Sequence, residues 1–137
     1  MPKEFIHPIR VYIEDTDAGG IVYYINYLKY MERSRTEFLR SLGYGKAAVL
    51  EGGLLLVVRS MQVDYLLPAR LDDEVVATAH LQKVAKTYVI FEQELRRAND
   101  ILCQATVKVA CVTQKEGSMR PTTMPAAMRN SLNHYLS

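Results

Sequence analysis

The sequence lacks the features that mark membrane, secreted and nucleic-acid-binding proteins. No apolar run reaches the roughly 18 residues of a transmembrane helix. The opening segment "MPKEFIHPIR" has no apolar core of signal-peptide length. Lysine and arginine are scattered, the net charge is only +2 and there is no acidic tail, so nothing indicates a nucleic-acid partner. We therefore expect a cytoplasmic protein without a membrane span.

Cysteine and histidine are also sparse. Cys103 and Cys111 fall in one alternating segment, which as a strand would separate them by roughly 26 Å. A disulfide needs Cα atoms within about 7 Å, so both are predicted to be small buried residues that do not pair with each other. The three histidines, at positions 7, 80 and 134, have no Cys or His nearby at metal-ligand spacing. We expect no metal site.

What the sequence does contain is enough apolar material for one core. Residues 1–137 fit a single domain, and 49% of them are hydrophobic. Residues 5–15 alternate as a half-buried strand, and 26–42 repeat as an amphipathic helix, with Asn26 as N-cap and Gly43 as the glycine that ends it. Further strands are predicted at 54–67, 74–84, 87–97 and 101–113, followed by an irregular segment and a short helix after Pro125.

The order of these elements predicts the fold class. Four strands joined by short turns favour antiparallel pairing. A sheet with one apolar face needs a cover, and 26–42 is the one long helix available. The sequence therefore predicts an α+β protein in which an antiparallel sheet of about five strands wraps around one long central helix.

The junction "EDTDAGGIVYYINYLKYMERSR" (14–35) does not fit an ordinary strand-rich domain. Asp15 and Asp17 stand two residues apart, directly before a double glycine, and the chain then enters an aromatic-rich helix. Together with "VVRSMQVDYLLPARLDD", this segment resembles the 4-hydroxybenzoyl-CoA thioesterase-like hotdog family. More narrowly it resembles the Tol-Pal-associated acyl-CoA thioesterases, the YbgC-like group. The likeness covers nearly the whole chain.

The resemblance implies a hotdog fold that hydrolyses an acyl-CoA thioester without metal or cofactor. It also implies a homodimer or homotetramer with sites that use both chains. It places the catalytic carboxylate at Asp17 and the helix N-terminus near Tyr24. Many members of the narrower group carry His at position 24, whereas the hydroxybenzoyl-CoA enzymes carry Tyr. We favour a role for the backbone N–H there, with the side chain shaping the acyl pocket or favouring an aromatic acyl group.

The chemistry at this junction can be judged physically. The first turn of a helix offers unpaired N–H groups and a positive dipole end, which stabilise negative charge on a thioester oxygen. The glycine pair lets the backbone pass close to a ligand. Asp17 would then act as nucleophile or as general base. The alternative is a turn aspartate that caps its own loop, the role we expect for Asp15.

Coenzyme A carries phosphates, and the resemblance places their contacts at Arg59, Ser60, Lys86 and Thr87. Each of these is alternatively a solvated surface residue. The competing function is a non-catalytic module that binds an acyl thioester or an acyl carrier protein, although such a module has no need of Asp17. A dehydratase would require a histidine beside the loop and helix start, and none of the three falls there.

Overall fold

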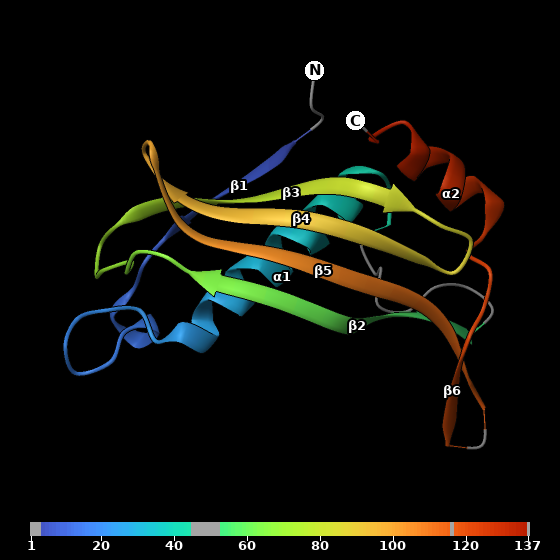
Figure 1. The fold of residues 1–137 in the computed structure, drawn as a ribbon, viewed down its shortest axis with the longest axis horizontal. Helices are drawn as coiled ribbons and strands as arrows, with labels where there is room; N and C mark the ends of the chain where they lie inside the picture. Colours follow the sequence, from blue (N-terminus) through green and yellow to red (C-terminus); the bar gives the residue numbers. More distant parts are fainter. Residues whose placement is uncertain (1–3, 45–52, 116, 137) are drawn as a thin grey trace.

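The chain folds into one antiparallel sheet with a long helix lying across one of its faces (Figure 1). This computed structural model describes residues 4–44, 53–115 and 117–136. In chain order the elements are β1 (Phe5–Arg10), the 3-10 helix η1 (Ile13–Asp15), α1 (Tyr24–Ser41), β2 (Leu54–Tyr65), β3 (Glu74–Val84), β4 (Tyr88–Arg97), β5 (Asp100–Lys115), β6 (Ser118–Pro121) and α2 (Ala126–Asn133). The predicted α+β class and the central position of the long helix are confirmed.

The order of strands in the sheet is β1-β3-β4-β5-β2, and β6 pairs with the end of β5. Strands β3, β4 and β5 form the predicted meander. The prediction of four strands joined by short turns is wrong for β2, which pairs with β5 and not with β3. Strands β5 and β4 lie between β2 and β3, so the connection 66–73 must pass these two strands to reach the start of β3. The segment predicted as irregular contains β6, which makes a sixth strand.

Strand β1 is shorter than the predicted strand 5–15. It ends at Arg10, and the chain then turns into η1. The turn forms because the amide of Tyr12 donates to the Asp15 carboxylate at 3.0 Å. Ile13 is therefore 76% exposed, whereas Val11 is fully buried.

The start of α1 also differs from the prediction. The helix begins at Tyr24, with Tyr23 as its N-cap residue, so Asn26 is not the cap. The Asn26 side chain instead donates to the carbonyl of Asp15 at 2.8 Å. The Asn26 side chain therefore bonds to a carbonyl group of the preceding loop and not to an amide of the helix end. The sequence pattern alone does not distinguish these two roles.

The predicted glycine at the end of α1 is confirmed. Gly43 has φ +95°, a backbone conformation that favours glycine. The amide of Gly43 donates to the carbonyl of Arg40 at 3.0 Å, and the amide of Tyr44 donates to that of Leu39 at 2.9 Å. These two bonds satisfy carbonyl groups that the helix itself leaves unpaired.

Apolar side chains fill the space between α1 and the sheet. Phe38 of α1 makes edge-on ring contacts with Phe91 of β4, at 5.9 Å between centroids, and with Tyr135, at 5.4 Å. Cys103 and Cys111 are buried and unpaired, as predicted. The predicted terminal helix is present as α2, which covers one end of the sheet and buries Met128 and Leu132.

One polar side chain sits inside this core. The amide of Gln93 on β4 donates to the carbonyls of Met31, at 2.9 Å, and Thr78, at 3.0 Å. Its oxygen accepts a hydrogen bond of 2.9 Å from the buried Arg35 guanidinium. Gln93 therefore joins α1 to β3 and β4, and it partners a buried charge.

Replacing Gln93 by leucine should lower the free energy of unfolding by about 2–4 kcal/mol, because it leaves a buried guanidinium without this acceptor. Gln104→Leu is the matched control, since Gln104 is exposed and its side chain donates to the Glu94 carboxylate across a long 3.3 Å. That variant should stay within about 0.5 kcal/mol of the parent. Urea denaturation measures both, and equal losses would contradict the role given to Gln93.

Candidate functional site

Asp17 lies in a tight hairpin that leads directly into α1. The hairpin is closed by an isolated bridge between Thr16 and Val22, and the Asp17 amide donates to the carbonyl of Ile21 at 3.0 Å. The carboxylate is exposed, and its Oδ1 accepts a hydrogen bond from the Gly19 amide at 2.9 Å. Gly20 has φ +74°, which explains one of the two glycines. Oδ2 accepts no hydrogen bond within the described part of the chain.

The first turn of α1 is anchored beside this hairpin. The carbonyl of Asp15 accepts the amide of Tyr23 at 3.0 Å as well as the Asn26 side chain. The amides of Tyr24 and Ile25, as the first of the helix, donate to no acceptor among the described residues. Asp17 and two free helix amides thus belong to one short unit that is tied together through Asp15.

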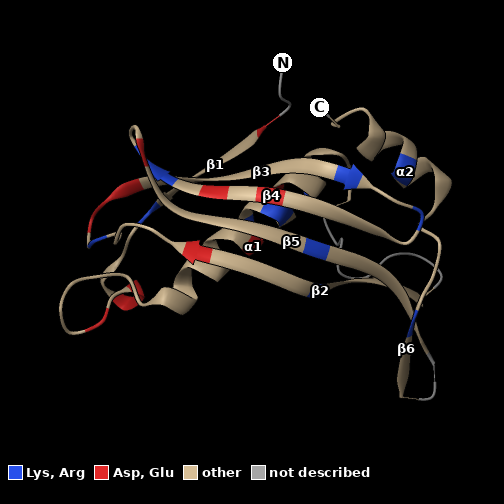
Figure 2. Ribbon diagram, in the orientation of Figure 1, with Lys and Arg blue, Asp and Glu red and all other residues tan. Residues whose placement is uncertain are grey.

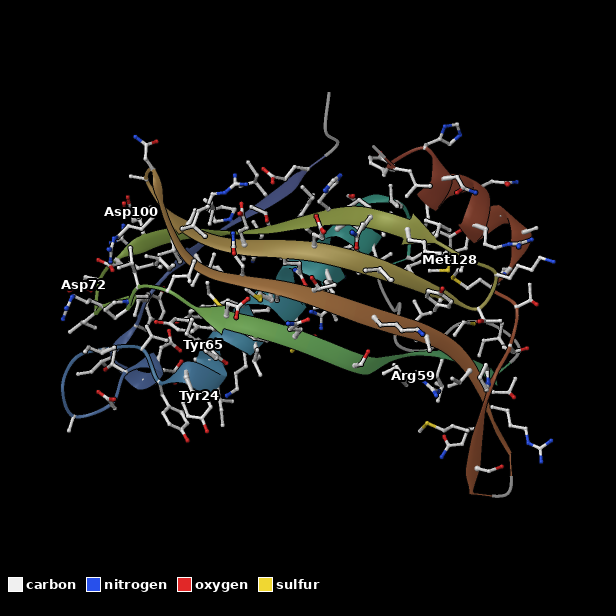
Figure 3. The ribbon with its side chains drawn as sticks, in the orientation of Figure 1. Tyr24, Arg59, Tyr65, Asp72, Asp100 and Met128 are labelled. Atoms are coloured by element: carbon white, nitrogen blue, oxygen red, sulfur yellow. The ribbon has the colours of Figure 1, made fainter. Side chains whose placement is uncertain are left out.

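A groove of about 260 Å³ opens next to this helix start. Tyr24 and Tyr65 lie side by side on its wall, with ring centroids 5.9 Å apart at 87° (Figure 3). Both rings are about half exposed, at 54% for Tyr24 and 44% for Tyr65. The groove joins the helix start to the end of β2 and is lined by Val22, Tyr24, Tyr27, Tyr65, Leu66, Leu67 and Pro68.

Two tyrosines that line the groove, Tyr27 and Tyr65, have raised pKa values. Burial raises the pKa of Tyr27, and the hydrogen bond from the Ala69 amide to its oxygen, 2.9 Å long, opposes this only in part. Burial likewise raises the pKa of Tyr65. Both shifts favour the uncharged form of these two phenols.

The predicted coenzyme A contacts lie elsewhere on the protomer. Arg59 is the extra residue of a β-bulge in β2, and Ser60 stands opposite Lys108. Lys86 and Thr87 form the turn between β3 and β4. Arg59 is six residues from Tyr65 along β2, roughly 20 Å by strand geometry, and Figure 3 shows the two well apart. In one protomer Asp17 lies in the hairpin that leads to Tyr24 at the start of α1, whereas Arg59 lies far along β2 from the groove at Tyr65.

The face of the sheet turned away from α1 carries a larger hollow, about 440 Å³. Its lining is polar and includes Asp64, His80, Glu92 and Glu94. None of the predicted site residues lines it. Acidic residues also gather in the loop between β1 and α1, whereas basic ones lie on β5 and at the end of β3 (Figure 2). Among the described residues, no group of three or more His, Cys, Asp or Glu side chains is arranged to hold a metal ion.

Sequence reasoning missed Tyr65, Leu66 and Leu67 as site residues. These residues fall at the end of the strand predicted at 54–67, but β2 ends at Tyr65 and all three side chains are exposed. The signal that could have found them is an aromatic and two leucines directly before Pro68, where a strand must end.

A family model described as the Thioesterase-like superfamily matches residues 11–132. The chain belongs to this superfamily. Within it, the acyl-CoA thioesterase YbgC of Haemophilus influenzae is 42% identical over 131 residues, which are 95% of this chain and 95% of that protein. The acyl-CoA thioester hydrolase YbgC of Escherichia coli O6:H1 is 39% identical over 125 residues, 90% of this chain and 92% of that protein.

A solved structure agrees with these relatives. The crystal structure of a probable thioesterase from Bartonella henselae has a TM-score of 0.79 and 32% identity to this chain, and covers 89% of this chain and 99% of its own. The resemblance to the hotdog thioesterases and the predicted enzyme class, a thioester hydrolase, are therefore confirmed. Within the described ranges no helix is long and apolar enough to span a membrane. The cytoplasmic location stays a prediction.

Asp15→Ala should lower the free energy of unfolding of this protein by about 1 kcal/mol, because the Tyr12 amide loses its carboxylate acceptor at the start of η1. Glu14→Ala is the matched control, since Glu14 is exposed in the same segment. It should change the free energy of unfolding by less than about 0.5 kcal/mol. Thermal or urea unfolding measures both, and an unchanged Asp15→Ala stability would remove the structural role of this carboxylate.

Proposed function

We propose that the protein hydrolyses an acyl-CoA thioester to a free acid and coenzyme A, with Asp17 as the catalytic carboxylate. The observation that carries this is the short unit in which Asp17 and the free amides of Tyr24 and Ile25 are tied together through Asp15. The names of its close relatives, acyl-CoA thioesterases, support the same substrate class.

Each part of the unit has a chemical task in this proposal. The thioester oxygen is directed at the free amides of the first helical turn, which stabilise the negative charge that develops on it. Asp17 acts in one of two ways. It attacks the carbonyl carbon, which breaks the C–S bond, releases coenzyme A as its thiolate and leaves a mixed anhydride that water hydrolyses. Alternatively it removes a proton from a water molecule that attacks the carbonyl carbon and displaces the thiolate. Because the amides belong to the backbone, position 24 accepts tyrosine where related enzymes carry histidine.

The aromatic groove beside the helix start is the proposed place for the acyl group. Tyr24 and Tyr65 give it flat aromatic walls. Apolar pockets with a few aligned donors are the usual form of a small-molecule site. The side chain of Tyr24 thereby shapes the acyl pocket while its amide contributes to the chemistry.

We also propose that two copies pair through the edge of β2. The sheet ends at β1 on one side and at β2 on the other. Strand β1 has six residues and contains Pro8, which cannot donate to a neighbouring strand. Strand β2 has twelve residues and no proline, and such a long open edge favours the addition of another strand.

Pairing at β2 would place Arg59 and Ser60 at the boundary between the two subunits. Two β2 strands related by a twofold axis run antiparallel, so the first half of one strand lies beside the second half of the other. Arg59 and Ser60 are the sixth and seventh residues of β2, so they would lie beside the same residues of the partner strand. We propose that these residues, with Lys86 and Thr87, contact the phosphates of coenzyme A.

A non-catalytic binding module is the alternative function, with an acyl carrier protein as the alternative carrier of the acyl group. It would use the same groove without turnover. The exposed Asp17 carboxylate argues against it, because a charged group beside an apolar groove does not help to bind a neutral acyl chain. A panel of short, long and aromatic acyl-CoAs, assayed for free thiol, separates turnover from binding.

Asp17→Asn should lower kcat on the best substrate of that panel by at least about 100-fold, because the amide can neither attack the carbonyl nor take a proton. The stability should stay close to that of the parent, since the Gly19 amide keeps an oxygen acceptor. Glu14→Gln, which removes an exposed carboxylate from the same segment, is the control and should keep the parental kcat. Parental turnover in Asp17→Asn would show that another group is the catalyst.

Val58→Lys should convert the oligomer to a smaller species, because a twofold interface would bring the two new charges close together. Val58 is 48% exposed on β2. Ile6→Lys is the control, since Ile6 is 51% exposed on β1, the opposite edge. Light scattering coupled to size exclusion measures both masses. An oligomer that Ile6→Lys disrupts and Val58→Lys leaves intact would place the interface at β1.

A further inference from the structure

The hairpin that carries Asp17 is held by a segment about fifty residues further along the chain. The carbonyl of Ala69 accepts the amide of Val22 at 2.8 Å, and the amide of Leu71 donates to the carbonyl of Gly20 at 3.1 Å. Ala69 is itself fixed, because its own amide donates to the Tyr27 hydroxyl. The connection 66–73 between β2 and β3 is therefore hydrogen-bonded along one side of the hairpin that carries Asp17.

The side chain of Arg97 hydrogen-bonds to this connection at two places. Arg97, the last residue of β4, donates through Nη1 to the Asp73 carboxylate at 2.7 Å and to the carbonyl of Pro68 at 3.2 Å. The same oxygen of Asp73 accepts the Arg70 amide at 2.8 Å. Pro68 and Arg70 flank Ala69, so these bonds surround the residue that the hairpin contacts.

The ion pair is charged at neutral pH. Burial by itself raises the pKa of the Asp73 carboxyl, but the hydrogen bonds from Arg97 and from the Arg70 amide outweigh it and hold the pKa below its ordinary value. The contribution of the pair is present at neutral pH and is lost only in acid, as the pH falls through that lowered pKa.

We infer that the Arg97–Asp73 pair is a positioning element for catalysis: it holds the connection 66–73 in place, and through it the Asp17 hairpin against the start of α1. This rests on the proposed function, because it assigns the pair to the same site. Arg97 touches no reacting atom in this scheme and acts only through the connection. A small displacement of a reacting group is enough to slow a reaction, since about 1 Å can cost as much as about 100-fold.

The neighbouring residue provides a matched control. Arg96 also forms ion pairs, with Glu4 at 2.8 Å and with Glu94. These lie away from the connection 66–73. Removing either arginine deletes one charged side chain from the end of β4, but of the two only Arg97 contacts the connection 66–73.

Arg97→Ala should lower kcat on the best acyl-CoA about 10- to 100-fold and change KM by less than about threefold. Arg96→Ala should keep kcat within about twofold. Arg97→Lys should recover only part of the loss, because an ammonium group does not reproduce the planar guanidinium geometry. Urea unfolding of all three variants separates a loss of rate from a loss of stability.

Amide hydrogen exchange gives a second readout that needs no turnover. Arg97→Ala should speed exchange in 16–22 and in 66–73, whereas Arg96→Ala should not. Equal falls in kcat for the two alanine variants, or unchanged exchange in 16–22 for Arg97→Ala, would overturn the inference. A parent protein that hydrolyses no acyl-CoA would instead overturn the proposed function, and the exchange result would still decide whether the pair holds the hairpin.

Discussion

The attachment of α1 to the sheet is the constraint on which the rest of this structure depends. Apolar packing alone would let a helix slide or rotate over a flat apolar face. The buried amide of Gln93 prevents this, because it must bond to Met31 on the helix and to Thr78 on β3 at the same time. Ser34 adds a second fixed point through the carbonyl of Ala77, at 2.9 Å. Buried polar groups must be paired, so these bonds allow one position of the helix.

Once the helix is fixed, its first turn lies at a seam where the hairpin directly before it meets a connection about fifty residues further along the chain. The hairpin 16–22, the start of α1 and the connection 66–73 meet there, and most of the bonds between them join backbone groups. Backbone bonds do not depend strongly on side-chain identity. Substitutions in these segments can therefore leave the arrangement of their backbone groups unchanged.

Exposed apolar surface is concentrated at the same seam. Large apolar patches on a protein surface usually mark a binding site or an interface. Exposed large apolar side chains also occur in the loop that follows β1. Across these segments they are Tyr12, Ile13, Tyr23, Tyr24, Ile25, Tyr65, Leu66, Leu67 and Leu71.

Features set by local physics could be predicted from the sequence alone. The amphipathic period of α1, the glycine that ends it and the turns between β3, β4 and β5 each depend on nearby residues, and the Asp17 junction could be singled out by its unusual composition. The pairing of β2 with β5, the contact between Tyr24 and Tyr65, and the grip of Arg97 on Asp73 were decided only by the tertiary structure. These contacts join residues 24 to 59 positions apart. Which distant groups meet depends on how the whole sheet closes around its helix, and no local pattern encodes it.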